Sequence, residues 1–357
     1  MKKKIIIFYP YINAFGGIER LIIELSKNLS INLVCYYDKI NITKYNKNLK
    51  KIELKPSSYL QKIIYLKKYF KSTNTIGYSL MWGYKASFFA FLSRIKNYGV
   101  FIDDPPSLLS NYRDKINNNP LNFIKSKIAK KIENYSIQNA KFRLTQTKRN
   151  SLELSKNFNC NFEYFYPGLA FNINKKLIKS DKEINILSLS RLEKNKKVKW
   201  IIQCLKDLKA ENPNLYKKIK INIAGEGAEK ESLKKFSYNA KISEKINFLG
   251  FVSDKQKNIL LKKNHIFLVP AKQGYGLPVL EALNYMNKIV VNKESRISEV
   301  LSENNEIKIA NNNYLSFYNK FKLILKESNS FDLNIIKKLP KSVDWVKFIE
   351  NKCKWKN

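Results

Sequence analysis

The sequence is poor in residues that bind metals or form disulfides. It contains one histidine, and its four cysteines stand far apart, at positions 35, 160, 204 and 353, without a CxxC pair. A zinc site needs a cluster of such ligands and a disulfide framework needs paired cysteines, so both are disfavoured. The cysteine pattern fits a reducing compartment, and we expect a cytoplasmic protein.

Long apolar runs are also lacking. The N-terminal segment MKKKIIIFYPY has a basic start, but its apolar run is too short for a signal peptide and leads into an amphipathic pattern, so we interpret it as a first strand. The most apolar later window, residues 76–95, is interrupted by Lys85 and Arg94. We therefore predict no membrane-spanning helix.

Acidic residues are few. The sequence has 29 Asp and Glu and 67 Lys and Arg, which gives a formal net charge of +38. Such an excess attracts nucleic acid, anionic membrane surfaces and phosphorylated substrates. Abundant Lys, Asn and Ile would also arise in an AT-rich genome without selection for any partner. The lysines form no dense tail, so charge alone does not choose between these interpretations.

The chain is organised around residues 265–291. Residues 266–269 are a short apolar run that predicts a buried strand ending at Pro270, and Gly274 and Gly276 follow in a loop. The only histidine, His265, lies at the start of this strand, and we expect it to be structural.

A helix is predicted to begin directly after this loop. Pro278 suits a first helical turn, whose free N–H groups and dipole bind anions. Glu281, one turn in, brings two acceptor oxygens that match the vicinal hydroxyls of a ribose. A nucleotide would fit this segment; the alternative is a plain strand–turn–helix joint with Glu281 solvated.

The first half alternates strand-like and helical patterns. Gly16 and Gly17 separate a first strand, residues 3–9, from a helix, and a second strand follows from Ile31. The expected helices at 59–70, 83–95 and 121–140 alternate with expected strands at 75–80, 99–102 and 142–145. This order predicts a Rossmann-like parallel sheet with right-handed crossovers. Two glycines without the GxGxxG pattern do not by themselves indicate a site.

Two acidic residues, Asp103 and Asp104, end one of these strands. At the carboxyl edge of a parallel sheet they would bind a hydroxyl or a cation. Asp104 would equally cap the turn made by Pro105 and Pro106, which is the structural interpretation.

A second alternation starts at Glu183. The basic segment RLEKNKK lies between a strand and a helix, so Arg191 and Lys196 put positive charge where a pyrophosphate would lie. A chance cluster in a lysine-rich chain is the rival explanation. Further on, Gly225 and Gly227 follow another expected strand.

These residues together resemble the retaining glycosyltransferases of family 4, the glycosyl transferases group 1, which have the GT-B fold. The resemblance implies an α/β protein with two Rossmann-like domains whose parallel sheets face across a cleft. It implies an acceptor-binding domain at 1–169 that includes a C-terminal crossing helix at 342–357, a linker at 170–182, and a nucleotide-sugar-binding domain at 183–341.

The resemblance also assigns roles. The segment from Gln273 to Glu281 matches the Glu-x7-Glu signature, except that Gln273 replaces the acidic residue that contacts the donor sugar; Glu281 would hold the ribose. Arg191 and Lys196 would hold the diphosphate, with Lys197 in place of the usual glycine. Asp103 stands where the family has a histidine near the donor sugar. The remaining donor-binding positions implied are Gly16, Gly17, Gly225, Phe251, Val252, Gly274, Tyr275, Gly276 and Leu277.

The function implied is transfer of a sugar from a nucleotide-sugar to a glycan or lipid-linked acceptor, in cell-surface polysaccharide or glycolipid biosynthesis. No metal and no cofactor are expected, and a basic first domain would hold the enzyme at the inner face of the membrane. Because Gln273 and Asp103 depart from the family pattern, an inactive sugar-nucleotide-binding protein is an alternative. A nucleic-acid-binding protein is more remote, since no nucleic-acid motif is present. An epimerase of the same architecture would need acid and base groups that the sequence does not indicate.

Overall fold

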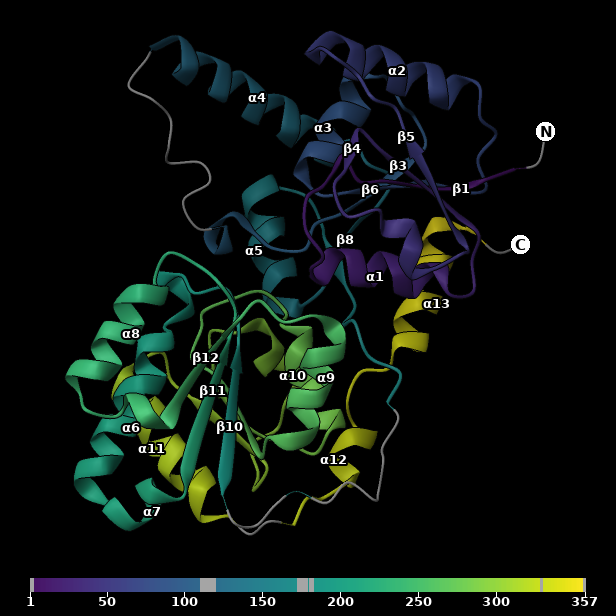
Figure 1. Ribbon diagram of the computed structural model, residues 1–357. Coiled ribbons are helices and arrows are strands. Elements are labelled where there is room, and N and C mark those ends of the chain that lie inside the picture. Colours follow the sequence, from purple (N-terminus) through teal and green to yellow (C-terminus); the bar gives the residue numbers. More distant parts are fainter. Residues whose placement is uncertain (1–2, 110–119, 172–178, 180–182, 328–329, 356–357) are drawn as a thin grey trace. The chain divides into compact units, whose positions relative to one another are not determined.

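The computed structural model describes residues 3–109, 120–171, 179, 183–327 and 330–355. The chain divides into two units, residues 1–167 with 342–357 and residues 168–341 (Figure 1). Residues 172–178 and 180–182 of the predicted linker lie outside the described part of the chain.

Unit 1 is built on a seven-stranded parallel sheet. Its order, β5-β3-β1-β6-β7-β8-β9, is the doubly wound Rossmann order with one strand added at the edge. The first strand reads IIIF and is buried throughout, as expected for a parallel strand covered on both faces. The strands are β1 (Ile5–Phe8), β3 (Ile31–Cys35), β5 (Leu49–Glu53), β6 (Ser79–Trp82), β7 (Tyr98–Phe101), β8 (Arg143–Thr145) and β9 (Glu163–Tyr164).

Helices connect these strands, and a small parallel pair, β2 (Tyr11–Ile12) and β4 (Tyr37–Asp38), lies beside the sheet. The helices are α1 (Gly17–Ser26), α2 (Tyr59–Lys71), α3 (Tyr84–Leu92), α4 (Pro120–Gln138), α5 (Lys148–Phe158) and α13 (Ser342–Cys353).

The last helix, α13, packs within unit 1 although it is the end of the chain. The buried ring of Trp345 meets that of Phe101 edge-on at 6.3 Å. The N–H of Tyr78 donates to the carbonyl of Cys353 at 2.8 Å. Hydrophobic contact and backbone pairing together fix this helix to the sheet.

The fourth strand of the sheet differs from the prediction. The expected strand at 75–80 is replaced by β6 at Ser79–Trp82, because Gly77 has φ +57°, which interrupts an extended chain. A Cβ at Gly77 would lie 2.0 Å from the carbonyl oxygen of Cys353, so α13 requires glycine there. Strand β5 and helix α5 were not predicted from the periodic pattern.

Unit 2 has a six-stranded parallel sheet in the order β12-β11-β10-β13-β14-β15. The order reverses between β10 and β13, as it does between β1 and β6 in unit 1, and ligands of doubly wound sheets bind at such switch points. The strands are β10 (Ile184–Leu189), β11 (Ile219–Ala224), β12 (Ile246–Gly250), β13 (Ile266–Val269), β14 (Lys288–Asn292) and β15 (Ile307–Ala310).

The helices of unit 2 are α6 (Val198–Glu211), α7 (Pro213–Lys217), α8 (Lys230–Asn239), α9 (Asp254–Lys263), α10 (Leu277–Asn284), α11 (Tyr314–Lys326) and α12 (Asn334–Lys337). The predicted α/β class with two parallel-sheet units is confirmed. Over the described residues, the helices are too short or too polar to cross a bilayer.

Candidate functional site

The loops that follow β10 and β13 meet through two predicted site residues. Lys196 ends a short 3-10 turn after β10, and its Nζ donates to Oε1 of Gln273 at 3.2 Å. The two strands are hydrogen-bonded neighbours in the sheet. The contact therefore lies at the switch point of unit 2, where this topology binds ligands.

The glycine loop holds Gln273 against the start of α10. The N–H of Arg296 donates to the carbonyl of Gln273 at 3.1 Å. Gly276 has φ +73°, and a Cβ there would lie 3.1 Å from Nε2 of Gln273. Tyr275 and Leu277 are buried at 3% and 7% exposure, so their side chains serve packing. The loop offers its backbone at the start of the helix, where Pro278 has no N–H and the N–H of Val279 donates to the carbonyl of Gly276 at 3.0 Å.

Glu281 lies in the second turn of α10 and carries an ion pair that the sequence did not reveal. Nζ of Lys257, on α9, lies 2.7 Å from Oε1 of Glu281 and 3.0 Å from Oδ1 of Asp254. The side chain of Lys257 is only 6% exposed and that of Glu281 17%. The buried ammonium of Lys257 thus orients Glu281, the residue predicted to bind the ribose.

Arg191 occupies a different environment from Lys196. Its guanidinium pairs with Glu193 at 2.8 Å, and its side chain is 72% exposed. The structure therefore brings Lys196 and Gln273 together and directs Arg191 to a neighbouring carboxylate.

Lys197 lies in the loop between β10 and α6, and its backbone has a conformation that usually favours glycine. Its φ of 52° and ψ of 30° are left-handed. Its Nζ lies 4.3 Å from the ring centroid of Trp200 and donates to Oδ1 of Asn312. The side chain stabilises a backbone turn that a glycine would adopt without strain.

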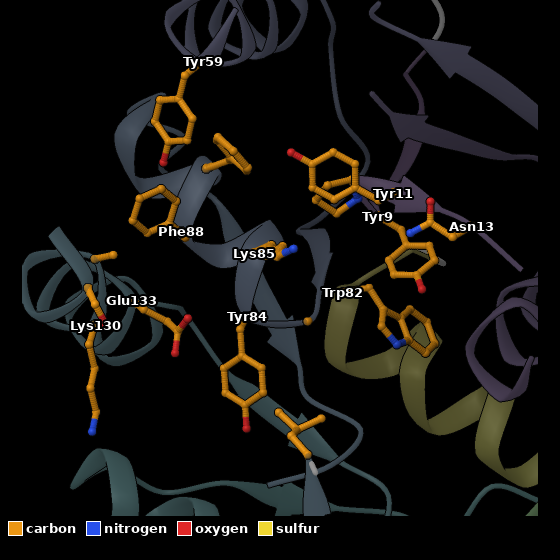
Figure 2. A pocket seen from close by; sticks show the side chains of 16 residues that line it. Tyr9, Tyr11, Asn13, Tyr59, Trp82, Tyr84, Lys85, Phe88, Lys130 and Glu133 are labelled. Atoms are coloured by element: carbon orange, nitrogen blue, oxygen red, sulfur yellow. The ribbon is translucent and has the colours of Figure 1, made fainter. Parts of the chain in front are cut away.

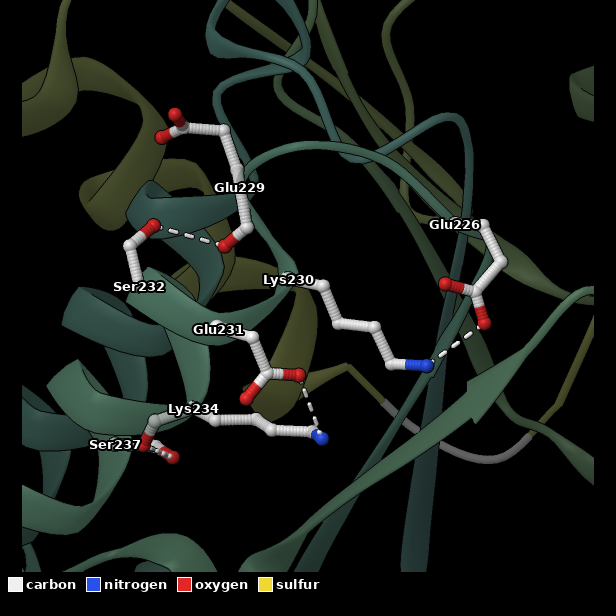
Figure 3. Close-up of polar contacts among 7 residues, drawn as sticks. All are labelled: Glu226, Glu229, Lys230, Glu231, Ser232, Lys234 and Ser237. Atoms are coloured by element: carbon white, nitrogen blue, oxygen red, sulfur yellow. Dashed lines mark hydrogen bonds and ion pairs between the residues drawn. The ribbon is translucent and has the colours of Figure 1, made fainter.

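The glycines after β11 let two loops pack closely. A Cβ on Gly225 would lie 1.9 Å from the carbonyl oxygen of Ser190, and one on Gly227 would lie 2.3 Å from that of Leu192. Gly225 thus shapes the loop that carries Arg191. Ion pairs at the start of α8 hold the turn, with Lys230 to Glu226 at 2.7 Å (Figure 3).

Two further residues of unit 2 were singled out in the sequence. Phe251, which the resemblance implies as a donor-binding position together with Val252, is 79% exposed directly after β12, and Val252 is half-buried. His265 supports the fold, because its Nδ1 accepts the N–H of Asn185 at 3.0 Å. No group of three His, Cys, Asp or Glu side chains suited to a metal ion occurs in the described part of the chain.

In unit 1, Gly16 and Gly17 form the start of α1. The N–H of Gly16 donates to Oε2 of Glu19 at 2.8 Å, while the Cβ position of Gly17 is open. Glu19 is 4% exposed, and its burial raises the pKa of its carboxyl. Burial and the charge of Glu19 also raise the pKa of the nearby Tyr9 hydroxyl.

Asp103 sits in a network that the sequence did not predict. Nε1 of Trp82 donates to its Oδ2 at 2.7 Å, and Nε2 of Gln146 donates to its Oδ1. Nδ2 of Asn150 donates to its carbonyl oxygen at 2.6 Å. Burial, and next the charge of Asp104, raise the pKa of Asp103 to about 8 against these hydrogen bonds. The carboxyl therefore keeps its proton to a higher pH than an exposed aspartate does.

The chain resembles known proteins in sequence. Residues 170–341, nearly the whole of unit 2, match the family described as glycosyl transferases group 1. The match covers just under half of the chain and lies within unit 2. A relative, alpha-monoglucosyldiacylglycerol synthase of Streptococcus pneumoniae, is 22% identical over 180 residues, which cover 50% of this chain and 36% of that protein.

Solved structures share the fold over almost the full length. The lipopolysaccharide outer core galactosyltransferase WaaB has a TM-score of 0.71 at 14% identity, covering 98% of each chain. Sucrose-phosphate synthase of Thermosynechococcus elongatus has a TM-score of 0.76 at 10% identity, again covering 98% of each chain. HepE of Anabaena in complex with UDP has a TM-score of 0.70 at 14% identity, covering 98% of this chain and 99% of that one. The chain therefore has the GT-B fold.

Proposed function

We propose that this glycosyltransferase moves a sugar from a nucleotide-sugar donor to a hydroxyl of a glycan or lipid-linked acceptor, with retention of anomeric configuration. The contact between Lys196 and Gln273 carries this proposal. It puts an ammonium and a side-chain amide side by side at the switch point, next to the N-terminus of α10. Those groups suit a diphosphate and the sugar attached to it.

The chemical difficulty is departure of a nucleoside diphosphate while positive charge develops on the anomeric carbon. Lys196 and the N–H groups at the start of α10 would stabilise the charge on the leaving group, and Arg191 would join them by exchanging Glu193 for phosphate. Glu281 would hold the ribose hydroxyls. Fixed positive charge would here serve instead of a metal ion.

Retention follows if the acceptor attacks on the face that the diphosphate leaves. The bond from the anomeric carbon to the phosphate oxygen breaks, the bond to the acceptor oxygen forms, and the acceptor proton passes to a phosphate oxygen. No side-chain base is needed for this step. Activity that survives EDTA and product of retained configuration would support both points.

The base of the donor is uracil in this proposal, since HepE was solved with UDP and also with UDP-glucose. A thermal-shift screen across UDP-, GDP-, ADP- and CMP-sugars tests it, because a ligand that binds the native state raises the Tm. We expect UDP-sugars to raise it most. No shift with any nucleotide-sugar would contradict the proposal.

The neutral Gln273 favours a second candidate, a sugar-nucleotide-binding protein without transfer. Donor binding without hydrolysis or transfer to any acceptor would favour that candidate. The relative that makes a glucosyl diacylglycerol supports a lipid acceptor and action at a membrane surface.

A further inference from the structure

Unit 1 has cavities at both edges of its sheet. One cavity, of about 910 Å³, lies at the carboxyl ends of β1 and β6, where Tyr9, Trp82 and Tyr84 border it (Figure 2). Tyr59 of α2 and Phe88 of α3 add aromatic rings to the same cavity. Substrates of doubly wound sheets bind at this carboxyl edge. Another cavity, of about 410 Å³, lies at the amino ends of β6 and β7, the edge that such sheets do not use for substrates.

The cavity at the amino edge is formed where two helices end and the chain turns back into the sheet. Helix α2 ends at Lys71, and Thr73 and Thr75 of the following turn border the cavity before β6 begins. Helix α3 ends at Leu92, and Asn97 borders the cavity directly before β7. The cavity is therefore enclosed by two helix ends and two strand starts of one sheet.

The charged side chains of this cavity are all positive. They are Lys67 and Lys71 of α2 and Arg94 and Lys96 after α3, and the described lining contains no carboxylate. Over the residues that the structure describes, none of the four forms an ion pair. Like charges around one cavity repel one another, and a bound anion would relieve that repulsion.

Basic residues near a helix C-terminus can also serve the helix dipole, which puts about half a negative charge there. That role accounts for only part of the charge, because two helix ends supply about one negative charge against four cations. The backbone itself caps α3, since the N–H of Arg94 donates to the carbonyl of Phe91 at 2.9 Å and that of Ile95 to the carbonyl of Ala90 at 3.0 Å. An excess of positive charge remains at the cavity.

Ser79 brings a buried hydroxyl without a partner to the same cavity. The residue is 1% exposed, and its Oγ has no hydrogen-bond partner in the described part of the chain. Because side chains alternate along a strand, Ser79 shares a face with Met81, which packs in one cluster with Leu66 of α2 and Phe89 of α3. The hydroxyl thus faces the helix layer in which the cavity lies. Burying a hydroxyl without a partner is costly, and a ligand in the cavity would supply one.

We propose that this cavity binds a small, soluble phosphate ester whose body carries hydroxyl groups. Its phosphate oxygens accept hydrogen bonds from Lys67, Lys96 and the hydroxyl of Ser79, and Thr73 and Asn97 bind hydroxyls of its body. A cavity of about 410 Å³ suits a ligand of the size of a sugar phosphate. The site is separate from the donor site proposed in unit 2, and it does not depend on the proposed transfer.

Calorimetric titration of the full chain with ribose 5-phosphate, at physiological ionic strength and with ribose as the uncharged comparison, tests the site. We expect ribose 5-phosphate to bind and ribose not to bind. Lys67→Gln/Lys96→Gln should weaken binding about tenfold. Lys141→Gln/Lys156→Gln removes the same charge at exposed positions elsewhere on unit 1 and should change the affinity by less than about twofold. Lys196→Ala, in unit 2, should also leave the affinity unchanged.

The hydroxyl of Ser79 has its own readout. Ser79→Ala should weaken ribose 5-phosphate about fivefold and raise the Tm of the ligand-free protein by roughly 2 °C, because a buried hydroxyl without a partner is removed. Ser93→Ala is the matched control: Ser93 is also 1% exposed and borders the cavity, but its Oγ donates to the carbonyl of Ile63 at 3.1 Å. Ser93→Ala should lower the Tm. An equal decrease in Ser79→Ala would show that its hydroxyl is structural and remove it from the site.

Hydrogen exchange locates the ligand. Ribose 5-phosphate should slow exchange at residues 72–79 and 93–97. Protection confined to unit 2, or binding lost in Lys196→Ala, would place the ester in the donor site and overturn the proposal. The proposal also fails if ribose 5-phosphate does not bind, or if the two double-lysine variants lose affinity equally. Sedimentation with phosphatidate vesicles that requires Lys67 and Lys96, without binding of ribose 5-phosphate, would assign the cavity to a lipid headgroup and reject a soluble ligand.

Discussion

Nζ of Lys257 lies 2.7 Å from Oε1 of Glu281 in an ion pair formed by side chains that are 6% and 17% exposed. The two residues stand on separate helices, α9 and α10. The pair fixes the carboxylate that is proposed to hold the ribose. Its removal should therefore affect both stability and donor binding.

We expect Lys257→Met to lower the free energy of unfolding by roughly 2 kcal/mol and to weaken UDP-glucose binding about tenfold, since a partly buried carboxylate loses its cation. Denaturant unfolding and calorimetry measure the two effects. The double variant Lys257→Met/Glu281→Gln should regain stability without regaining donor affinity. If the double variant binds the donor normally, Glu281 has no part in donor recognition.

Lys196→Ala should reduce sugar transfer by about 100- to 1,000-fold, because removal of one donor to a developing charge costs roughly 3 kcal/mol. Arg191→Ala should act in the same direction if the diphosphate draws Arg191 away from Glu193. Initial rates with saturating acceptor measure both. Lys206→Ala, on the exposed side of α6, is the matched control, and a Lys196 variant as active as this control would remove Lys196 from the mechanism.

Gln273→Glu should raise the affinity for UDP-glucose relative to UDP. A carboxylate accepts sugar hydroxyls more strongly than an amide, while its pairing with Lys196 takes charge away from the diphosphate. We expect the ratio of the two affinities to rise about tenfold in calorimetric titrations. An unchanged ratio would show that this side chain does not reach the sugar.

Asp103 should make the protein less stable as the pH rises from about 4 to about 8. Its pKa is raised to about 8 in the native state, so across this window the native state keeps a proton that the unfolded chain releases. Asp103→Asn should remove this slope and be more stable than the parent at pH 9. The side-chain amide introduced at position 103 fits this hydrogen-bond network if the side-chain amide of Gln146 flips, so that its oxygen accepts instead of its nitrogen donating.

Unfolding in denaturant at pH 5, 7 and 9 measures the difference between parent and variant. Asp344→Asn, at an exposed position on α13, is the control. Parallel pH profiles for the parent and Asp103→Asn would contradict the raised pKa.

The sequence predicted the α/β class because its periodic patterns are local. The apolar run at residues 266–269, the glycines after it and Pro278 define a strand, a loop and a helix start within a few turns of chain. The capping box that Ser253 and Gln256 form at the start of α9 depends on the same short-range chemistry. Strand β6 was misplaced because Gly77 is set by α13, which is distant in sequence.

The sequence alone determined the α/β class and many of the strands and helices, and that a glycine loop with a nearby carboxylate and upstream basic residues lies in the second half. Only the tertiary structure decided that Lys196 meets Gln273, that Lys257 holds Glu281 and that Arg191 turns to Glu193. It also decided that aromatic residues of α2, of α3 and at the ends of β1 and β6 line one cavity. Local periodicity in the sequence specifies helices and strands. These contacts, in contrast, join residues that are far apart in the chain, or they depend on how the loops pack. Among 67 lysines and arginines, no sequence signal distinguishes the few that the fold buries or brings together.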